Sequence, residues 1–158
     1  MSDPGLSSIR FTGGCQCGAV RFAATEPPEE VSVCYCRMCQ KAGGGPFMAM
    51  ARFRSGAVAW TRGQPATFHS SAAAARGFCA ACGTPLSYQR RPEALSLTTG
   101  AFDDPGGLVP TTRLGAATVL PWTDRLADLP LESTDDWLNA LPRGGHEFRT
   151  LQHPDHDT

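Results

Sequence analysis

The sequence predicts a mainly β fold of short antiparallel strands, and three observations support this prediction. The 158 residues include 17 glycines and 13 prolines, which favours turns over long helices. Apolar and polar residues alternate over short segments, as they do in strands with one buried face. Seven cysteines lie in three tight clusters. Zinc ions bound by these thiols would form the centres around which the strands are arranged.

The strand-like segments follow one another along the chain and are separated by glycine, proline and serine. The first two flank the sequence GGCQCG and are expected to form a hairpin. The third leads into CYCRMCQKAGGGP, where glycines and a proline limit any helix begun near Arg37 to a single turn. The predicted strands up to position 99 are Ser8–Thr12, Ala19–Ala24, Val31–Tyr35, Phe47–Phe53, Ala57–Thr61, Ala66–His69, Thr84–Gln89 and Leu95–Thr99.

The C-terminal part of the sequence has a different character. The chain continues through Thr111–Leu120, and the segment Ser133–Leu141 then carries the clearest helix signal, with a serine and a threonine at its start that can cap it. The residues from Pro142 onward are polar and aperiodic, so we expect a mobile tail there. The predicted organisation is one zinc-binding β domain over residues 8–126, followed by a C-terminal helix and polar tail over residues 127–158.

Charge and hydropathy exclude several kinds of partner. A net charge of −1 gives no general attraction to nucleic acid or to anionic lipid. No apolar run approaches the roughly 18 residues of a membrane span, and MSDPGLSS lacks the features of an export signal. We therefore expect a cytoplasmic protein with neither nucleic acid nor membrane as partner, whose thiols stay free of disulfides.

The cysteine spacing points to metal binding. An odd number of cysteines cannot all pair as disulfides, and pairs of the CxC and CxxC type can each give two thiolates to one ion. Zinc takes four ligands in a tetrahedron, so two such pairs close a structural site. Glycine follows both outer pairs, at Gly18 and Gly83, and permits the positive φ that such turns need. The residues predicted for this structural site are Cys15, Cys17, Cys79 and Cys82.

The remaining cluster, Cys34, Cys36 and Cys39, supplies three thiolates and leaves one position open. An open position for water or substrate is typical of catalytic zinc. One alternative is a redox dithiol at Cys79–Cys82, although CGTPLSY continues as a strand and does not open a helix. Another is a second structural site, closed by His69 or another side chain as the fourth ligand. All-thiolate sites also suit iron, but the absence of redox context favours zinc.

The cysteine motifs resemble those of a known family. GCQCGAVRF, CYCRMCQKAGG, RGFCAACGTPLSY and a later PW match, in order and approximate spacing, the glutathione-dependent formaldehyde-activating enzymes, also called centromere-protein-V-like. The resemblance extends from Phe11 to Trp122 and includes every cysteine. It implies a β-tent type fold with one structural and one catalytic zinc ion, held by the four-cysteine and three-cysteine sets respectively. Tyr35 and Gln40 depart from the family pattern, in which histidine or a small polar residue and arginine are common.

The family activity is the condensation of glutathione with formaldehyde to S-hydroxymethylglutathione, which is a carbon–sulfur lyase reaction run in reverse. The resemblance therefore implies a zinc-dependent carbon–sulfur lyase, with Cys34, Cys36 and Cys39 as the catalytic metal site. Its partners would be a small thiol such as glutathione and a small electrophile such as formaldehyde. The alternative is a non-catalytic binding module in which both zinc sites are structural, and the fourth ligand of the second zinc distinguishes the two.

Overall fold

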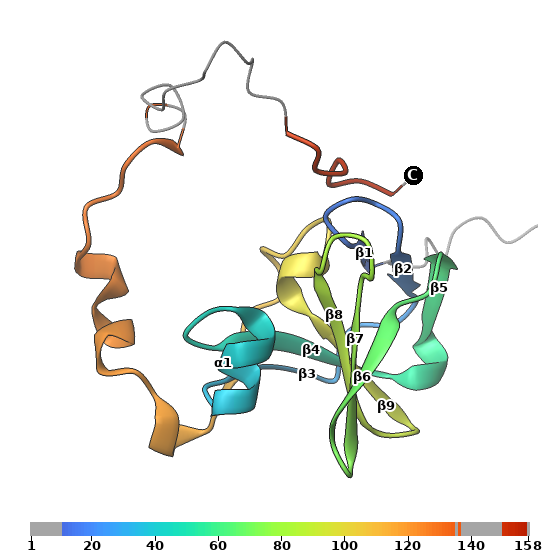
Figure 1. The fold of residues 1–158 in the computed structure, drawn as a ribbon, viewed down its shortest axis with the longest axis horizontal. Helices are drawn as coiled ribbons and strands as arrows, with labels where there is room; N and C mark the ends of the chain where they lie inside the picture. The colour runs from blue at the N-terminus through green and yellow to red at the C-terminus, as the bar shows by residue number, and fades with distance from the viewer. Residues whose placement is uncertain (1–10, 135, 137–149, 158) are drawn as a thin grey trace, which may run out of the picture.

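The computed structural model describes residues 11–134, 136 and 150–157, and the strands within them form two sheets (Figure 1). The smaller sheet has the order β1 (Phe11–Gly14), β2 (Arg21–Ala24), β5 (Val58–Arg62). The larger sheet has the order β10 (Thr112–Leu114), β3 (Glu30–Cys34), β4 (Met48–Arg54), β9 (Ala94–Thr98), β8 (Pro85–Arg91), β7 (Ala74–Phe78), β6 (Ala66–Ser71). Neighbouring strands are antiparallel, except that β10 and β3 run parallel. The predicted mainly β fold is confirmed.

Some predicted elements differ from the observed ones. Strand β7 was not predicted, because Ala74–Phe78 is rich in alanine and contains a glycine, both poor strand formers. The segment Thr111–Leu120, for which the sequence predicted no element, contains the short β10, after which Gly115 turns the chain. The predicted helix Ser133–Leu141 and residues 8–10 of the first predicted strand lie wholly or mostly outside the described residues.

Helical structure is short. Helix α1 (Arg37–Gly43) begins at Cys36, whose Sγ accepts from the Cys39 N–H at 3.4 Å, and ends at Gly44 with φ of 67°. The 3₁₀ helices are η1 (Ser55–Ala57), η2 (Thr99–Ala101), η3 (Ala116–Thr118) and η4 (Pro121–Asp128). Among the described residues, none of the helices has the length and apolar character needed to cross a membrane.

The main core lies where the two sheets face each other. Phe22 of the small sheet and Phe53 of the large sheet are both fully buried, and each packs against Phe102, with ring centroids 5.0 and 5.9 Å away. Leu86 and Leu97 of the large sheet complete the fully buried layer. This shared aromatic core fixes the angle at which the turns of the two sheets approach each other.

A buried ion pair also joins the small sheet to the loop after η2. The Arg21 guanidinium donates to both carboxylate oxygens of Asp103, at 2.8 and 2.6 Å, and its side chain is only 3% exposed. The Thr12 hydroxyl donates to the same carboxylate at 2.6 Å. Because the two Nη groups and the carboxylate pair away from water, the pair is a structural element and not a surface contact, although the buried Arg21 Nε has no partner among the described residues.

Residues 150–157 lie against the turn between β1 and β2, visible as the red segment in Figure 1. The His153 N–H donates to the Gln16 carbonyl at 2.7 Å, and Arg21 donates to the His156 carbonyl at 3.1 Å. The prediction of a mobile tail did not anticipate these contacts. Polar composition suggested mobility, but backbone hydrogen bonds to a distant turn leave no trace in local sequence.

Candidate metal centres

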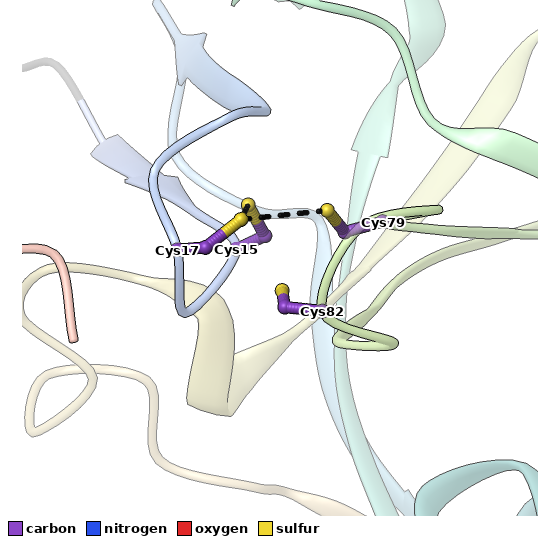
Figure 2. A group of neighbouring side chains, drawn as sticks. All are labelled: Cys15, Cys17, Cys79 and Cys82. Atoms are coloured by element: carbon purple, nitrogen blue, oxygen red, sulfur yellow. Dashed lines mark hydrogen bonds between the residues drawn. The ribbon is translucent and has the colours of Figure 1, made fainter. Parts of the chain in front are cut away.

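Four cysteines from two turns far apart in the sequence lie together (Figure 2). Cys15 and Cys17 come from the turn between β1 and β2, and Cys79 and Cys82 from the turn between β7 and β8. All four sulfurs lie within 4.8 Å of one another, with 3.6 Å between those of Cys15 and Cys17 and 3.8 Å between those of Cys17 and Cys79. The two turns belong to different sheets, so this cluster joins the small sheet to the large one.

The two turns are built alike, which explains why each presents two thiols inward. In each turn the first cysteine's N–H donates to a carbonyl five residues later, at 2.9 Å: Cys15 to Val20 and Cys79 to Thr84. Gly18 and Gly83 adopt φ of 77° and 78°, as their position after the second cysteine predicts. The positive φ lets the chain reverse tightly beside the sulfurs.

The four-cysteine geometry fits a tetrahedral ion. Zinc–sulfur bonds of about 2.3 Å in a tetrahedron place the sulfurs about 3.8 Å apart, which is the spacing seen between Cys17 and Cys79.

The thiols of this four-cysteine cluster differ in acidity. Burial raises the pKa of the Cys82 thiol, but hydrogen bonds from Thr84 and the neighbouring backbone outweigh it and lower the pKa to about 6. The Ala19 N–H lowers the pKa of Cys17, but its sulfur neighbours and burial outweigh that effect and raise it to about 12.

A second cluster brings together Cys34, Cys36 and Cys39, whose sulfurs also lie within 4.8 Å of one another. Cys34 ends β3, Cys36 caps α1 and Cys39 lies in its first turn, so one strand-to-helix junction positions all three. Cys39 is buried, whereas Cys34 and Cys36 are partly exposed. Among the described residues, no fourth histidine, cysteine, aspartate or glutamate joins this group.

The surroundings of this second cluster are apolar on one side. Met48 and Met50 of β4 pack against Cys39 as a small separate core.

The thiols of this second cluster also differ in acidity. Burial raises the pKa of the Cys34 thiol to about 12. Burial also raises the pKa of Cys36, but the Cys39 N–H and the neighbouring thiols outweigh it, so the pKa is lowered overall. Cys36 therefore ionises more readily than Cys34.

The two departures from the family pattern have structural roles. The Gln40 side chain is buried, and its Nε2 donates to the carbonyls of Tyr35 and Thr118, both at 2.8 Å. Tyr35 is also buried, packing against Phe47 with ring centroids 5.4 Å apart. Both residues therefore fix α1 against the end of β3 and neither offers a metal ligand.

Arg76 is a functional candidate that sequence reasoning missed. This β7 residue is 8% exposed, and its guanidinium donates to the sulfurs of Cys39 at 3.4 Å and Met48 at 3.6 Å. It also lies over the Tyr88 ring, 4.9 Å from the centroid. A charged residue alternating with small and apolar neighbours just before Cys79 was the available signal, and it was obscured because β7 itself was not predicted.

Neither His69 nor the cations of α1 belong to either cluster. His69 is exposed on β6 and does not join the three cysteines, so the structure does not support a site closed by that histidine. The glycines at 43–45 end α1. Arg37 and Lys41 are exposed on the outer side of α1, where they line a pocket of about 410 Å³ with Trp122.

Comparison with known proteins agrees with the cysteine geometry. A crystal structure of a Rhodobacter sphaeroides protein is similar in fold, with a TM-score of 0.53 and 24% sequence identity over 65% of this chain and 98% of that one. The family model of the glutathione-dependent formaldehyde-activating enzymes matches residues 10–116, a range that contains both clusters. The chain therefore belongs to the glutathione-dependent formaldehyde-activating enzyme family.

Proposed function

We propose that this protein is a zinc-dependent carbon–sulfur lyase that forms or cleaves adducts between glutathione, or a similar thiol, and a small electrophile such as formaldehyde. The observation that carries the proposal is the convergence of three cysteines without a fourth ligand among the described residues. Structural zinc sites are closed, whereas catalytic ones leave a position for water or substrate. The four-cysteine cluster is closed in this sense and is assigned the structural role.

Each cluster would hold one zinc ion, with Cys34, Cys36 and Cys39 as the ligands of the catalytic one. Zinc in that position lowers the pKa of a thiol that it binds, so that the thiol is present as thiolate near neutral pH. The residues of the chain hold this thiol beside the electrophile and so replace a bimolecular encounter by proximity. A carbon–sulfur bond forms at the carbonyl carbon, and the carbonyl oxygen takes up the proton that the thiol has lost.

The outer face of α1 supports glutathione as the thiol. Arg37 and Lys41 are separated by one turn of α1, and Trp122 lies across the pocket that they line. Glutathione carries two carboxylates, which suit two exposed cations near the cluster. Arg52 and Arg54 do not fit this role, because they pair with Glu30 and Glu26 on the β4 surface.

The test combines metal analysis with a thiol titration. We expect protein purified without chelator to contain two zinc ions per chain, and X-ray absorption to show one added sulfur ligand when glutathione is present. S-Methylglutathione is the matched control, because it keeps both carboxylates and lacks the thiol. Formation of the formaldehyde adduct, followed by NMR, should then exceed the spontaneous rate. If glutathione leaves the zinc ligands unchanged, the second site is closed and the non-catalytic binding module is the better interpretation.

A further inference from the structure

A pocket of about 280 Å³ lies beside the three-cysteine cluster and is not explained by formaldehyde chemistry. Its lining includes Ala42, Met48, Phe68, Phe78, Pro85 and Arg76. Two of these, Ala42 and Met48, also belong to the small core around Cys39, so the pocket and the cluster share a wall. The other side of the pocket is formed by the turn that follows Cys82.

The pocket is larger than the proposed electrophile needs. Formaldehyde has no side chain, whereas an apolar cavity of about 150 Å³ is enough to bind benzene. Carbon-rich side chains line most of this pocket, and Phe68 at its edge is 62% exposed. An exposed phenylalanine beside a pocket gives an apolar ligand a surface to cover, which lowers the free energy of its bound state.

Arg76 gives the pocket its one charged group. Its side chain is largely buried, and its Nε has no hydrogen-bond partner among the described residues. That nitrogen is out of a ligand's reach, but Nη1 and Nη2 donate to the sulfurs of Met48 and Cys39, which are weak acceptors. Each of these two nitrogens keeps a second N–H, from which an oxygen in the pocket can accept. The same guanidinium contacts the Cys39 sulfur at 3.4 Å, so an acceptor bound to Arg76 would lie close to the metal ligands.

We propose that this pocket binds the apolar side chain of an aldehyde, whose carbonyl oxygen accepts a hydrogen bond from Arg76. This inference rests on the proposed function, and it names the substrate class of the same site as aldehydes with an apolar side chain of about benzyl size. The thiol sulfur bonds to the carbonyl carbon and the carbon–oxygen π pair moves to oxygen. That oxygen then takes the proton released by the thiol, which yields a hydroxyalkyl thioether with no other reactant. Arg76 is the catalytic residue in this step because it contacts the oxygen on which negative charge develops.

The first test measures binding without chemistry. 2-Phenylethanol has the side chain of phenylacetaldehyde but no electrophilic carbon, and it is titrated into the zinc-loaded protein carrying labelled alanine and methionine methyl groups. We expect shifts at the Ala42 and Met48 methyl signals in NMR spectra. The substitution Ala42→Leu, which fills the pocket from α1, should weaken this binding about tenfold. Absence of shifts at these methyls, or shifts unaffected by Ala42→Leu, would overturn the inference.

The second test compares phenylacetaldehyde with formaldehyde as substrates for adduct formation with glutathione. Phe68→Ser should lower kcat/KM for phenylacetaldehyde about tenfold more than for formaldehyde, whereas Val109→Ser, at a residue that is also exposed but lines no part of the pocket, should not change this ratio. Arg76→Lys should lower kcat for both aldehydes by about a hundredfold while the zinc content stays at two ions.

The outcomes separate the two proposals. Activity with formaldehyde, without 2-phenylethanol binding or discrimination by Phe68→Ser, would overturn the pocket assignment and leave the proposed function in place. Binding of 2-phenylethanol without adduct formation from either aldehyde would overturn the proposed function and the role of Arg76. A loss of zinc in Arg76→Lys would overturn its catalytic role and make it a support of the metal ligands.

Discussion

Cysteine-to-serine substitutions in the two clusters should have different consequences. Cys36→Ser removes a ligand from a junction that belongs to one sheet and one helix, so we expect one zinc ion to be lost while the fold is kept. Cys82→Ser opens the cluster that joins both sheets, so it should give insoluble or unfolded protein. Zinc stoichiometry and far-ultraviolet circular dichroism measure both effects. Equal unfolding by the two substitutions would contradict the division into structural and catalytic sites.

The Arg21–Asp103 pair should control part of the acid stability. Asp103→Asn leaves the buried guanidinium with only the Asp157 carboxylate, 3.7 Å away, which we expect to cost about 3 kcal/mol at pH 7. Asp104→Asn is the matched control, because the Asp104 side chain is exposed and should change stability by less than about 0.5 kcal/mol. Urea denaturation of the three proteins measures these differences.

The difference in stability between the wild type and Asp103→Asn should depend on pH with a definite sign. Burial raises the pKa of Asp103, but hydrogen bonds from Arg21 and Thr12 outweigh it and hold the pKa below its ordinary value. A lowered pKa in the folded state means that the stabilisation is present above the unfolded pKa of about 3.9 and is lost as the pH falls through the folded value. The stability difference between the wild type and Asp103→Asn should therefore be constant near neutrality and shrink below about pH 4. A constant difference down to acid pH would mean that the carboxylate charge is not what stabilises the fold.

At the level of single residues, the sequence predicted which cysteines lie together, and their roles as metal ligands stay a prediction. Ligand spacing is local, and a glycine after Cys17 and another after Cys82 already specify turns that point thiols inward. Arg76 could not be predicted in the same way, because its contact with Cys39 joins residues 37 positions apart. Local patterns do not show which distant residues become neighbours in a sheet.

Among the secondary-structure elements, the short strand β10 should matter for the second cluster through the turn that follows it. Gly115 has φ of 77°, and a Cβ at this position would lie 2.7 Å from the Cys36 backbone nitrogen. Gly115→Ala should therefore displace Cys36 and weaken zinc binding at the three-cysteine site about tenfold, in addition to a backbone strain of about 1–3 kcal/mol. A zinc competition titration with a chelator of known affinity measures the change.

Gly44→Ala is the matched control for that substitution. Gly44 also has a positive φ of 67°, but a Cβ there would meet nothing within 4 Å. It should therefore show the backbone strain with a much smaller change in zinc affinity. Equal losses of zinc affinity in the two variants would mean that strain, and not contact with Cys36, is responsible.

The C-terminal segment 150–157 should protect the four-cysteine cluster. It lines a pocket together with Cys15 and Cys82, and the His153 ring covers Gly18 so closely that a Cβ there would lie 2.3 Å from it. Deletion of residues 150–158 should speed zinc release from this cluster severalfold and cost about 1 kcal/mol of stability. Leu151→Ala, at a residue 83% exposed, should change neither quantity. An unchanged release rate after the deletion would show that the segment does not limit access to the metal.

The elements show where sequence patterns are sufficient and where they are not. Strands with clear alternation, such as β4 and β9, were predicted close to their observed bounds. Strand β7 was missed, although it lies inside the larger sheet. Its Gly77 lies close to β8 and Pro65, since a Cβ there would lie 2.3 Å from the Ser87 Oγ and 3.2 Å from the Pro65 Cβ. Packing between neighbouring strands thus overrides local strand propensity.

At the scale of the whole molecule, composition and periodicity predicted the fold class but not the order of the strands. The parallel pairing of β10 with β3 depends on a connection of more than 70 residues, visible in the partnership of Leu114 with Cys34. This pairing brings Gly115 beside the second cluster, and the facing of the two sheets brings the four cysteines together. Each metal centre is therefore a product of the complete fold, although its ligands can be found in short motifs.

Stepwise removal of zinc should reveal how far the fold depends on each centre. The three-cysteine site supplies fewer ligands, so a chelator should remove its zinc first without loss of the circular dichroism of the strands. The closed site joins both sheets. The apparent binding free energy of structural zinc is roughly 10–16 kcal/mol, and the total stability of a typical domain is about 5–15 kcal/mol. The aromatic core of Phe22, Phe53 and Phe102 also joins the sheets, but it is not expected to compensate for a loss of that size. Loss of the second zinc ion should therefore unfold the protein cooperatively, as followed by simultaneous zinc release and circular dichroism. If the strands persist in the metal-free protein, the core alone holds the two sheets together and the four-cysteine cluster is not the structural centre.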